Sequence, residues 1–509
     1  MKLSSIIPLR NEICLGSKDI EISSVSYDSR NIQNGGVFFA LSGHTTDGRK
    51  YIPQALESGA SVIVTDKEIK GINAVQIIVD DVASYMALFC AKFFNHPDRE
   101  LKIIGVTGTN GKTTITYMIE SILAHLGIGC AVFGTVSYRY AGKIIAAPNT
   151  TPQSLDVYKM MREAANAGVK YLAMEVSSHA LSLGRVAGID FDIAVWTNLT
   201  QDHLDFHKTM DAYFAAKASL FTGLGAGPKK NEKFAIINAD DEYGVKLSKM
   251  PLKAQVKTYS AKENFNADFQ AKNINIDGSG SKFDVFYGGQ TGRVDIKHIG
   301  LHNVHNALAA LGAVVCAGVS FEQAVSGINN SAQAPGRLER VNSKNLGFEV
   351  VVDYAHTDDA LKNVLQALKA LNPSRIITVF GAGGDRDRTK RPLMGKTAVE
   401  MSDFVFITSD NPRTEEPKQI LLDIEVGIKR SGKNNYKVVC DRDTAIKEAV
   451  ISAQSGDIVL VAGKGHENYQ IVGSEKFHFN DCETAEKYIN ERLSLKNSKK
   501  EKGQKEFSF

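Results

Sequence analysis

The chain has few of the residues and runs that mark secreted, membrane-spanning or zinc-binding proteins. Its 509 residues include 6 cysteines, never in a Cys-x-x-Cys pair, and a single tryptophan. Cysteines so scattered in so long a chain indicate buried, reduced thiols rather than disulfides or a zinc site. No stretch approaches the roughly 18 apolar residues of a membrane-spanning helix, and the first residues lack an apolar signal core. We therefore expect a cytoplasmic protein with no membrane partner.

A strong excess of one charge is also missing. The 60 Lys and Arg residues nearly balance 57 Asp and Glu residues, which leaves a net charge of +3. Residues 496–509 hold 5 Lys and 2 Glu, and this segment accounts for the whole excess. The rest of the chain is neutral and has no broad basic face for nucleic acid. We expect residues 496–509 to form a disordered basic tail.

The most informative motif that is present covers residues 105–114, Gly-Val-Thr-Gly-Thr-Asn-Gly-Lys-Thr-Thr. An apolar run precedes it and a helical pattern follows, so the glycines lie in a strand-to-helix turn. Backbone N–H groups of such a turn bind nucleotide phosphates, Lys112 adds a charge, and the Thr113 hydroxyl can bind magnesium. Val106 stands where the strict phosphate-loop pattern has its first glycine. The predicted nucleotide-binding residues are Gly108, Thr109, Asn110, Gly111, Lys112, Thr113 and Thr114.

Along the whole chain, strand-like apolar runs alternate with helical patterns. This alternation predicts an α/β fold with mainly parallel sheets, and the length predicts about three domains. Turn signals near residues 97 and 334 separate them. We expect a smaller N-terminal α/β domain at 1–97, a central P-loop-type ATPase domain at 98–334, a C-terminal Rossmann-like domain at 335–495, and then the tail.

Polar residues follow two further apolar runs of the central block. Glu175 comes directly after the run 171–174, and His203 follows the run 193–196. If these strands neighbour the strand that feeds the glycine-rich turn, both side chains converge on the phosphates. Thr113 and Glu175 suit one magnesium ion, and His203 could complete a second site. Alternatively, Glu175 is an ordinary surface carboxylate and the histidines are capping or core residues.

Lys217 occupies an unusual position in the predicted helix 211–221. It shares an apolar stripe with Tyr213, four residues before it, and Leu220, three residues after it. A lysine on such a stripe usually extends its ammonium group to water. The alternative is a lysine drawn into the active site and chemically altered there.

Three loops of the last block follow apolar strands and can face one cleft. They cover residues 380–387, 409–413 and 462–467. Arg386 and Arg413 could each bind a carboxylate through two parallel hydrogen bonds, and Glu467 could bind an ammonium group. The loops favour a zwitterionic substrate with several carboxylates, whereas ordinary surface salt bridges are the alternative.

Taken together, these motifs resemble the Mur ligase family of peptidoglycan synthesis, up to about residue 488. The ordered motifs that carry the resemblance are at 27–30, 108–114, 149–152, 174–179, 202–203, 213–217, 302–306, 335–339, 353–356, 410–413 and 463–467. The family forms amide bonds with ATP. ATP phosphorylates a substrate carboxylate, and an amine then displaces the phosphate through a tetrahedral intermediate.

The resemblance implies the cofactors and the residues that hold them. We expect ATP and two Mg²⁺ ions, one bound by Thr113 and Glu175 and the other by His203 and a CO₂-derived carbamate on Lys217. Lys112, Lys217, His203 and Glu175 would be the catalytic group. Asn303 would lie beside the adenine, and Arg337 and Asp353 would approach the ATP from the last block.

The resemblance also implies the substrates of a monomeric enzyme. UDP-MurNAc-L-Ala-D-Glu would contact Ser29, His44, Asn149, Thr150, Thr151, Ser177 and Arg185. The incoming amino acid would contact Arg386, Asp410, Asn411, Arg413, Gly463 and Glu467. In this family the sequence Asp-Asn-Pro-Arg at 410–413 goes with meso-diaminopimelate, whose distal carboxylate Arg413 would bind.

Three alternatives stay open at this point. L-lysine could replace meso-diaminopimelate, although Arg413 would repel it by roughly 1–4 kcal/mol at contact distance. A folylpolyglutamate-type ligase shares the chemistry but usually has Gly-Ser after Gly-Lys, where this chain has Thr113 and Thr114. A nucleotide-driven switch protein would not require the three loops of the last block.

Overall fold

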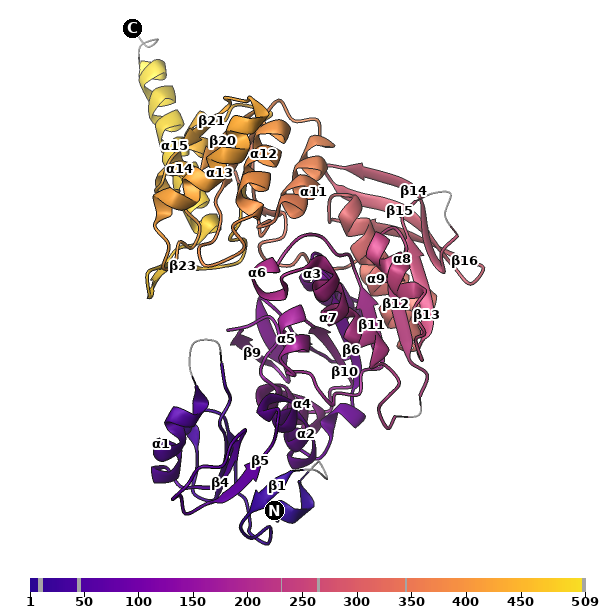
Figure 1. Cartoon of the computed structure of the whole chain (residues 1–509). Coiled ribbons are helices and arrows are strands. Elements are labelled where there is room, and N and C mark those ends of the chain that lie inside the picture. Colours follow the sequence, from indigo (N-terminus) through magenta and orange to yellow (C-terminus); the bar gives the residue numbers. More distant parts are fainter. Residues whose placement is uncertain (8–11, 44–46, 230, 263–265, 344–345, 506–509) are drawn as a thin grey trace.

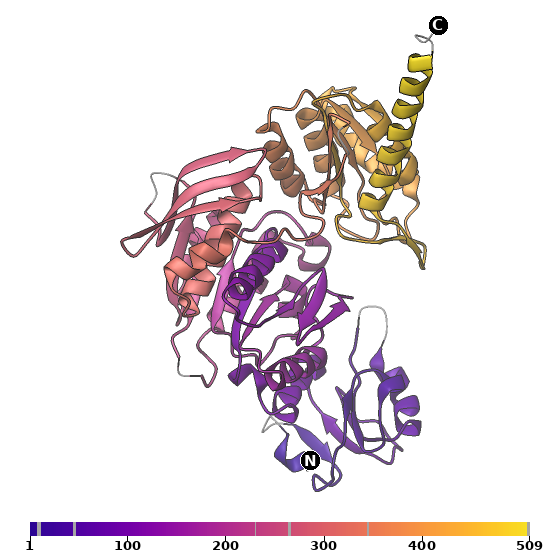
Figure 2. The ribbon, with the colours of Figure 1, turned by 180° about the vertical axis from the view of Figure 1, so that it is seen from behind.

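The chain forms three successive sheets with helices packed against them. The N-terminal and C-terminal sheets lie at opposite ends of the central sheet (Figures 1 and 2). This computed structural model describes the backbone of residues 1–7, 12–43, 47–229, 231–262, 266–343 and 346–505, and side chains only as far as residue 495.

The N-terminal sheet is parallel except at one edge, where its first strand pairs antiparallel with its neighbour. Its strands, in pairing order, are β1 (Ile13–Leu15), β5 (Val75–Ile78), β4 (Ala60–Thr65), β3 (Gly36–Phe39) and β2 (Val25–Ser26). Helix α1 (Ile52–Glu57) buries Ile52 and Ala55 in a small core with Phe38 and Ile63.

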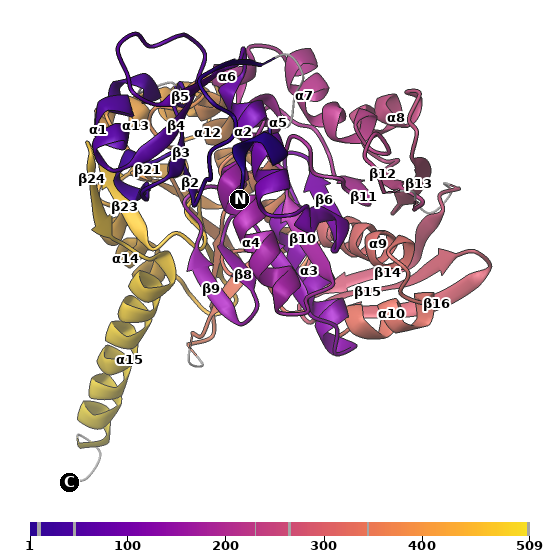
Figure 3. The ribbon, with the colours of Figure 1, turned by 90° about the horizontal axis from the view of Figure 1, so that it is seen from below.

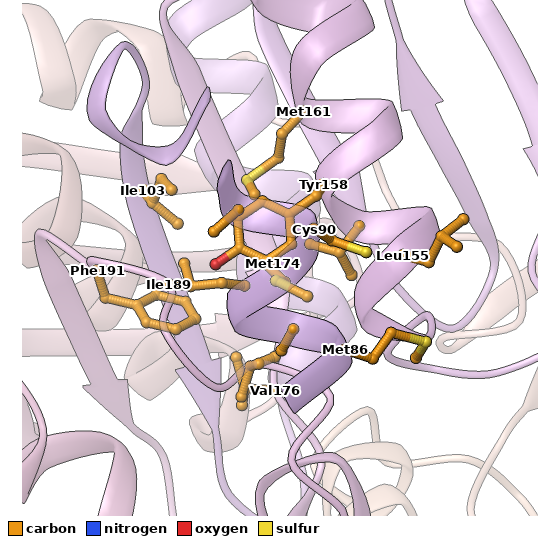
Figure 4. Close-up of a cluster of buried hydrophobic side chains, with 14 of the residues drawn as sticks. Met86, Cys90, Ile103, Leu155, Tyr158, Met161, Met174, Val176, Ile189 and Phe191 are labelled. Carbon is orange, nitrogen blue, oxygen red and sulfur yellow. The ribbon is translucent and has the colours of Figure 1, made fainter. Parts of the chain in front are cut away.

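Helix α2 (Val82–Phe93) connects this first sheet to the central block through a shared core. Met86 and Cys90 of α2 lie in one buried cluster with Tyr158 of α4 (Ser154–Asn166) and Met174 (Figure 4). Burying one such side chain is worth about 1.5–3 kcal/mol. The residues before the expected boundary at 97 therefore share the hydrophobic core of the residues after it.

The central sheet is parallel in its middle and antiparallel at both edges. Its strands, in pairing order, are β16 (Gln290–Ile296), β15 (Gly280–Tyr287), β14 (Phe269–Asp277), β13 (Gln255–Ser260), β12 (Phe234–Asn238), β11 (Ile193–Trp196), β6 (Lys102–Thr107), β10 (Tyr171–Glu175), β7 (Cys130–Phe133), β8 (Ser137–Tyr140) and β9 (Lys143–Ala146). Strand β6 lies between β10 and β11, so the condition for convergence of Glu175 and His203 is met.

Helices cover both faces of the parallel middle of the central sheet, which explains why β6, β10 and β11 are largely apolar runs. Ile104 and Val106 of β6 face a core shared with α3 (Lys112–His125), α9 (Leu301–Cys316) and α10 (Phe321–Ile328). Ile103, on the opposite face, belongs to the core of α2, α4 and α7 (Met210–Thr222). The shorter helices α5 (Ser178–Ser182), α6 (Leu204–His207) and α8 (Glu242–Ser248) follow strands of this sheet.

The C-terminal sheet is parallel apart from its first strand. Its strands, in pairing order, are β17 (Glu339–Val341), β18 (Glu349–Asp353), β22 (Ile458–Ala462), β19 (Ile376–Phe380), β20 (Phe404–Ile407) and β21 (Tyr436–Val438). Helices α11 (Asp358–Lys369), α12 (Lys390–Met401) and α13 (Pro417–Ser431) share one core, and α14 (Arg442–Ser452) and α15 (Asp481–Lys505) the other. A separate hairpin joins β23 (Tyr469–Val472) to β24 (Glu475–His478).

Two features differ from the expectations. Helix α15 projects from the C-terminal block and runs to Lys505, across most of the expected disordered tail (Figures 2 and 3). Residues 496–505 contain no proline, so every residue can donate its backbone N–H to the helix, although Gly503 disfavours it. The cysteines form no disulfide, but only Cys90 is fully buried and Cys440 is exposed, so the expectation of buried thiols was wrong for Cys440.

Within the described part of the chain, every helix is too short or too polar to cross a bilayer.

Candidate functional site

The glycine-rich turn has a backbone that only glycine can adopt at two positions. Gly108 and Gly111 have φ angles of +146° and +90°. A Cβ atom would lie 1.8 Å from Thr197 Oγ1 at Gly108 and 2.4 Å from Asn306 Oδ1 at Gly111. Asn198 supports the turn, because its backbone and side-chain oxygens accept the N–H groups of Thr109 and Asn110, both at 2.9 Å. The turn thus has a fixed shape before any ligand binds.

Two lysines meet at the carbonyl oxygen of Gly108. Lys112 Nζ donates to it at 2.9 Å and to the Thr109 carbonyl at 2.8 Å, and Lys217 Nζ donates to it at 2.8 Å. Burial lowers the pKa of both side chains, and the charge of Lys112 lowers that of Lys217 further. Lys217 is 1% exposed and packs against the Tyr213 ring. It is drawn into the site and does not extend to water.

Glu175 lies at the end of β10, beside Thr135, which follows the neighbouring strand β7. The Thr135 N–H and hydroxyl donate to the two Glu175 carboxylate oxygens at 2.8 and 2.9 Å. Glu175 is 1% exposed, so it is not an ordinary surface carboxylate. Its charge opposes the effect of burial on the pKa of Lys112, which places the two groups together. The sequence analysis missed Thr135.

The predicted sugar-peptide residues of the central block surround Glu175. Thr151 Oγ1 donates to the Glu175 carbonyl at 2.8 Å and accepts the Ser177 N–H at 3.0 Å. Arg185 Nη1 donates to the Thr151 carbonyl at 3.1 Å, while its buried Nε has no hydrogen-bond partner. Two further residues are nearby, because the Thr135 and Thr150 hydroxyl oxygens are 3.1 Å apart and the Tyr138 hydroxyl donates to the Asn149 carbonyl.

His203 precedes helix α6 with a φ angle of +56°. Its ring lies 4.8 Å from the His179 ring and 6.1 Å from the Tyr213 ring, measured between centroids. Burial lowers the pKa of His203 to about 3, against the opposing charge of Asp202. The imidazole is therefore neutral and keeps a nitrogen lone pair for a proton or a metal ion. Helix α6 and the start of α3 lie at the end of the central block that faces the C-terminal block (Figure 1).

A cavity of about 480 Å³ lies between the central and C-terminal blocks. Asn110, Thr114, Asn303, Arg337 and Asp353 all line it. Arg337 Nη2 donates to Thr113 Oγ1 at 3.1 Å, whereas its buried Nε has no partner. The Asp353 carboxylate accepts two backbone N–H groups of its own block, and Asn303 Nδ2 donates to the Ile299 carbonyl.

Sequence reasoning missed a further part of the cavity wall. His305 Nε2 and Asp240 Oδ2 are 2.8 Å apart, and both residues line the cavity. Asp240 follows strand β12, which the sequence analysis did not identify, so no signal linked it to the site.

The loops of the C-terminal block come together as expected. Arg413 has a φ angle of +52°, and its Nη1 donates to the Gly384 carbonyl at 2.7 Å. Burial lowers the pKa of Arg413, and the nearby charge of Arg386 lowers it further. The charges of Asp410, Glu467 and Asp385 act in the opposite direction. Two adjacent guanidinium groups are suited to binding a carboxylate.

The acidic and amide groups of these loops form a connected network. Asn411 Nδ2 donates to Glu467 at 2.8 Å, and Asn411 Oδ1 accepts the Ile471 N–H of β23. Burial works to raise the pKa of Asp410, but the charges of Lys464 and Arg442 hold it below its usual value. A Cβ atom at Gly463 would lie 2.6 Å from Asp410 Oδ2. The loops are not independent surface turns.

The structure does not join the N-terminal residues to this site. Ser29 is buried in the first block, where its hydroxyl donates to Gln54 at 2.7 Å. His44 lies outside the described residues. Among the described residues, no group of three or more His, Cys, Asp and Glu side chains is arranged to hold a metal ion.

This fold and site define a ligase that uses ATP, and the chain belongs to the Mur ligase family. Residues 21–94 match "Mur ligase family, catalytic domain", residues 106–314 match "Mur ligase middle domain", and residues 336–465 match "Mur ligase, glutamate ligase domain". The expected family and the expected α/β fold are confirmed.

Individual proteins are similar to this chain over most of its length. The UDP-N-acetylmuramoyl-L-alanyl-D-glutamate–2,6-diaminopimelate ligase 1 of Clostridium acetobutylicum is 43% identical over 494 residues, covering 96% of this chain and 100% of that protein. A solved structure of such a ligase is 36% identical, with a TM-score of 0.65 and coverage of 93% of this chain and 95% of that chain. Mycobacterium tuberculosis folylpolyglutamate synthase, 17% identical with a TM-score of 0.61, covers 75% of this chain and 92% of that chain and shares the fold alone.

The buried lysine at Gly108 generates a prediction about pH and stability. The pKa of Lys217 in the folded chain lies well below the ordinary value of 10.5. Between these two pKa values the unfolded chain binds more protons on this side chain, so stability rises as the pH rises across that window. The variant Lys217→Met lacks this group, so we expect a higher urea midpoint than the parent at pH 7 and a smaller difference at pH 9.5.

The measurement is urea unfolding in CO₂-free buffer, followed by the fluorescence of Trp196, the single tryptophan. Lys246→Met is the control, because Lys246 pairs with Asp211 on the surface. A parent midpoint equal to or above that of Lys217→Met at pH 7 would contradict the buried-amine interpretation.

Proposed function

We propose that the chain adds meso-diaminopimelate to UDP-MurNAc-L-Ala-D-Glu at the expense of ATP, in peptidoglycan precursor synthesis. The observation that carries the proposal is the pairing of Arg413 with Arg386 in loops held by Asn411 and Glu467. Two guanidinium groups and a carboxylate suit an amino acid with a second carboxylate and an ammonium group. Plain L-lysine has no carboxylate to offset Arg413. The full-length relatives named above support the same substrate.

The reaction needs activation because a carboxylate is a poor electrophile. We infer that a substrate carboxylate oxygen attacks the γ-phosphorus of ATP, which gives an acyl phosphate and ADP. The amine of diaminopimelate then attacks the acyl carbon, and the tetrahedral intermediate loses phosphate and a proton to give the amide. The N–H groups of the turn and the Lys112 ammonium would hold the phosphates and reduce the repulsion between the two anions.

We infer that the residues around Gly108 would hold two magnesium ions. Thr113 and Glu175 offer oxygen ligands for one, and neutral His203 offers a nitrogen for the other. Magnesium, when bound, would neutralise charge between the phosphates and the substrate carboxylate. The remaining ligand would come from Lys217. Its neutral amine can add CO₂ and lose a proton, which forms a carbamate with anionic oxygens in place of a cation that would repel the metal.

Substrate residues from all three blocks belong to the proposal. Asn303 would contact the adenine, with Arg337 and Asp353 beside the ATP. The residues proposed for the UDP-sugar peptide are Ser29, His44, Asn149, Thr150, Thr151, Ser177 and Arg185. We also infer a monomer, and the use of ATP favours a cytoplasmic location.

The reaction itself is the first test. The purified chain should release phosphate from ATP only when UDP-MurNAc-L-Ala-D-Glu and meso-diaminopimelate are both present, and mass spectrometry should find the amide product. Phosphate release with ATP alone would favour a nucleotide switch, and release with folate and glutamate a folylpolyglutamate-type ligase. A product formed equally well with L-lysine would overturn the choice of amino acid.

Arg413→Ala should impair the use of meso-diaminopimelate selectively. Loss of a hydrogen-bonded charge pair costs about 2 kcal/mol or more, so we expect KM for meso-diaminopimelate to rise by about 30-fold or more. KM for ATP should stay within about twofold of the parent, since Arg413 lies outside the nucleotide cavity. Arg388→Ala is the matched control, because Arg388 pairs with Asp423 at the surface. Equal changes in both KM values would refute the assignment of Arg413.

Lys217→Ala should remove most of the activity, and added formate or acetate should restore part of it. A small carboxylate can occupy the space of the proposed carbamate and supply the missing anionic oxygen. In the parent protein, ¹³C-labelled CO₂ should give a carbamate NMR signal that Lys217→Ala lacks. Undiminished activity in Lys217→Ala, or a complete loss without rescue and without the NMR signal in the parent, would remove the carbamate from the scheme.

A further inference from the structure

Asp202 connects the central block to the C-terminal block beside His203. The residue is 5% exposed, and its Oδ1 accepts the N–H of His203 at 2.9 Å. Three side-chain nitrogens approach the same carboxylate. His203 Nε2 is 3.4 Å from Oδ2, His356 Nε2 is 3.8 Å from Oδ2, and Lys390 Nζ is 3.6 Å from Oδ1. His203 belongs to the central block, whereas His356 and Lys390 belong to the C-terminal block.

The burial of Lys390 favours its contact with Asp202. It is the first residue of α12 and only 5% exposed. A buried ammonium group costs several kcal/mol unless an anion accompanies it, and Asp202 is the carboxylate with which Lys390 pairs. A second contact joins the same two segments. Gln201 Nε2 donates to Thr389 Oγ1 at 2.9 Å. The start of α12 therefore contacts residues 201 and 202 directly.

The position of α12 also depends on the loop that carries Arg386. Asp387 Oδ1 accepts the N–H of Thr389 at 2.9 Å, so the loop and the helix start form one unit. Burial lowers the pKa of His179, whose ring packs against the His203 ring, and the charge of Arg386 lowers it further. The amino-acid loop of one block thus lies close to the imidazoles of the other.

The distances around Asp202 indicate that three side chains compete for one carboxylate. Hydrogen bonds from nitrogen to oxygen are about 2.7–3.2 Å long, but all three side-chain nitrogens stand farther away. One carboxylate cannot hold all three closely in this geometry. A small displacement of the C-terminal block would bring Lys390 or His356 closer to the Asp202 carboxylate. The interaction of that carboxylate with the His203 ring would then change.

We propose that Asp202 is a positioning residue that couples the placement of the C-terminal block, through Lys390 and His356, to the orientation of the His203 ring. The catalytic role of this coupling rests on the proposed function, since His203 belongs to the proposed metal site. It brings the imidazole into its working orientation when the amino-acid loops are in place. Asp202 itself touches no reacting atom.

The test uses NMR of the full chain labelled with ¹⁵N-histidine, with the His203 ring signal assigned from His203→Gln. Lys390→Met should shift the His203 ring signal although the substitution lies in the other block, and Asp202→Asn should shift it too. Lys390→Arg should keep the parental signal, because it preserves the charge. Lys396→Met is the matched control on the same helix, since Lys396 pairs with Glu400 at the surface, and it should leave the signal unchanged.

Steady-state kinetics give the second readout. Removing a partner that orients a ligand typically costs 10–100-fold, so we expect kcat to fall by about tenfold or more in Asp202→Asn and Lys390→Met. KM for ATP should change little, and the double variant should be no worse than Asp202→Asn alone.

The two hypotheses fail in different ways. A His203 signal unmoved by Lys390→Met, or a double variant whose loss is the product of the two single losses, would overturn the coupling. A signal that moves as expected in a chain that forms no amide would support the coupling and refute the proposed function.

Discussion

Two lysine side chains share the carbonyl oxygen of Gly108, and the rest of the site depends on this crowding. Two ammonium groups so close together in a buried place repel each other, and each loses its hydration. The arrangement persists because Lys217 can lose its proton while Lys112 faces Glu175. It also needs a residue without a Cβ at position 108, since Thr197 fills the space where a side chain would begin.

The sheet order places the partners of these lysines within reach. Strand β6 lies between β10 and β11, so the residues that follow all three strands meet at one edge of the sheet. Glu175 lies at the end of β10, and His203 follows β11. Lys217 lies on α7, which packs against one face of the same sheet. The C-terminal block repeats the principle with the loops after β19, β20 and β22. On the side of the C-terminal block, the nucleotide cavity is lined by the end of β18 and by α11, including Asp353 and Asp359.

Much of this could be predicted from the sequence because local patterns carry it. The strands at 171–175 and 193–196 are continuous apolar runs, and the turn at 108–111 has glycines where the backbone requires them. The fate of Lys217 was not predictable, since the spacing on α7 fits both a buried and a water-exposed amine. The roles of Thr135 and Asp202 depend on which strands and blocks become neighbours. The helix at 496–505 was also not predicted, because we expected the excess of lysine in this segment to keep it disordered.

Helix α2 also determines how this protein can be divided for engineering. Because Met86 and Cys90 complete the core around Tyr158, a graft that replaces the first block by that of another ligase must leave Val82–Phe93 with its present partners. A junction at residue 97, where the turn signals lie, would remove that helix and open a hole beneath the sheet. A cut in the short connection between β5 and α2 keeps that helix with α4, but it must also preserve the packing of Phe89 against Phe39 of the first sheet.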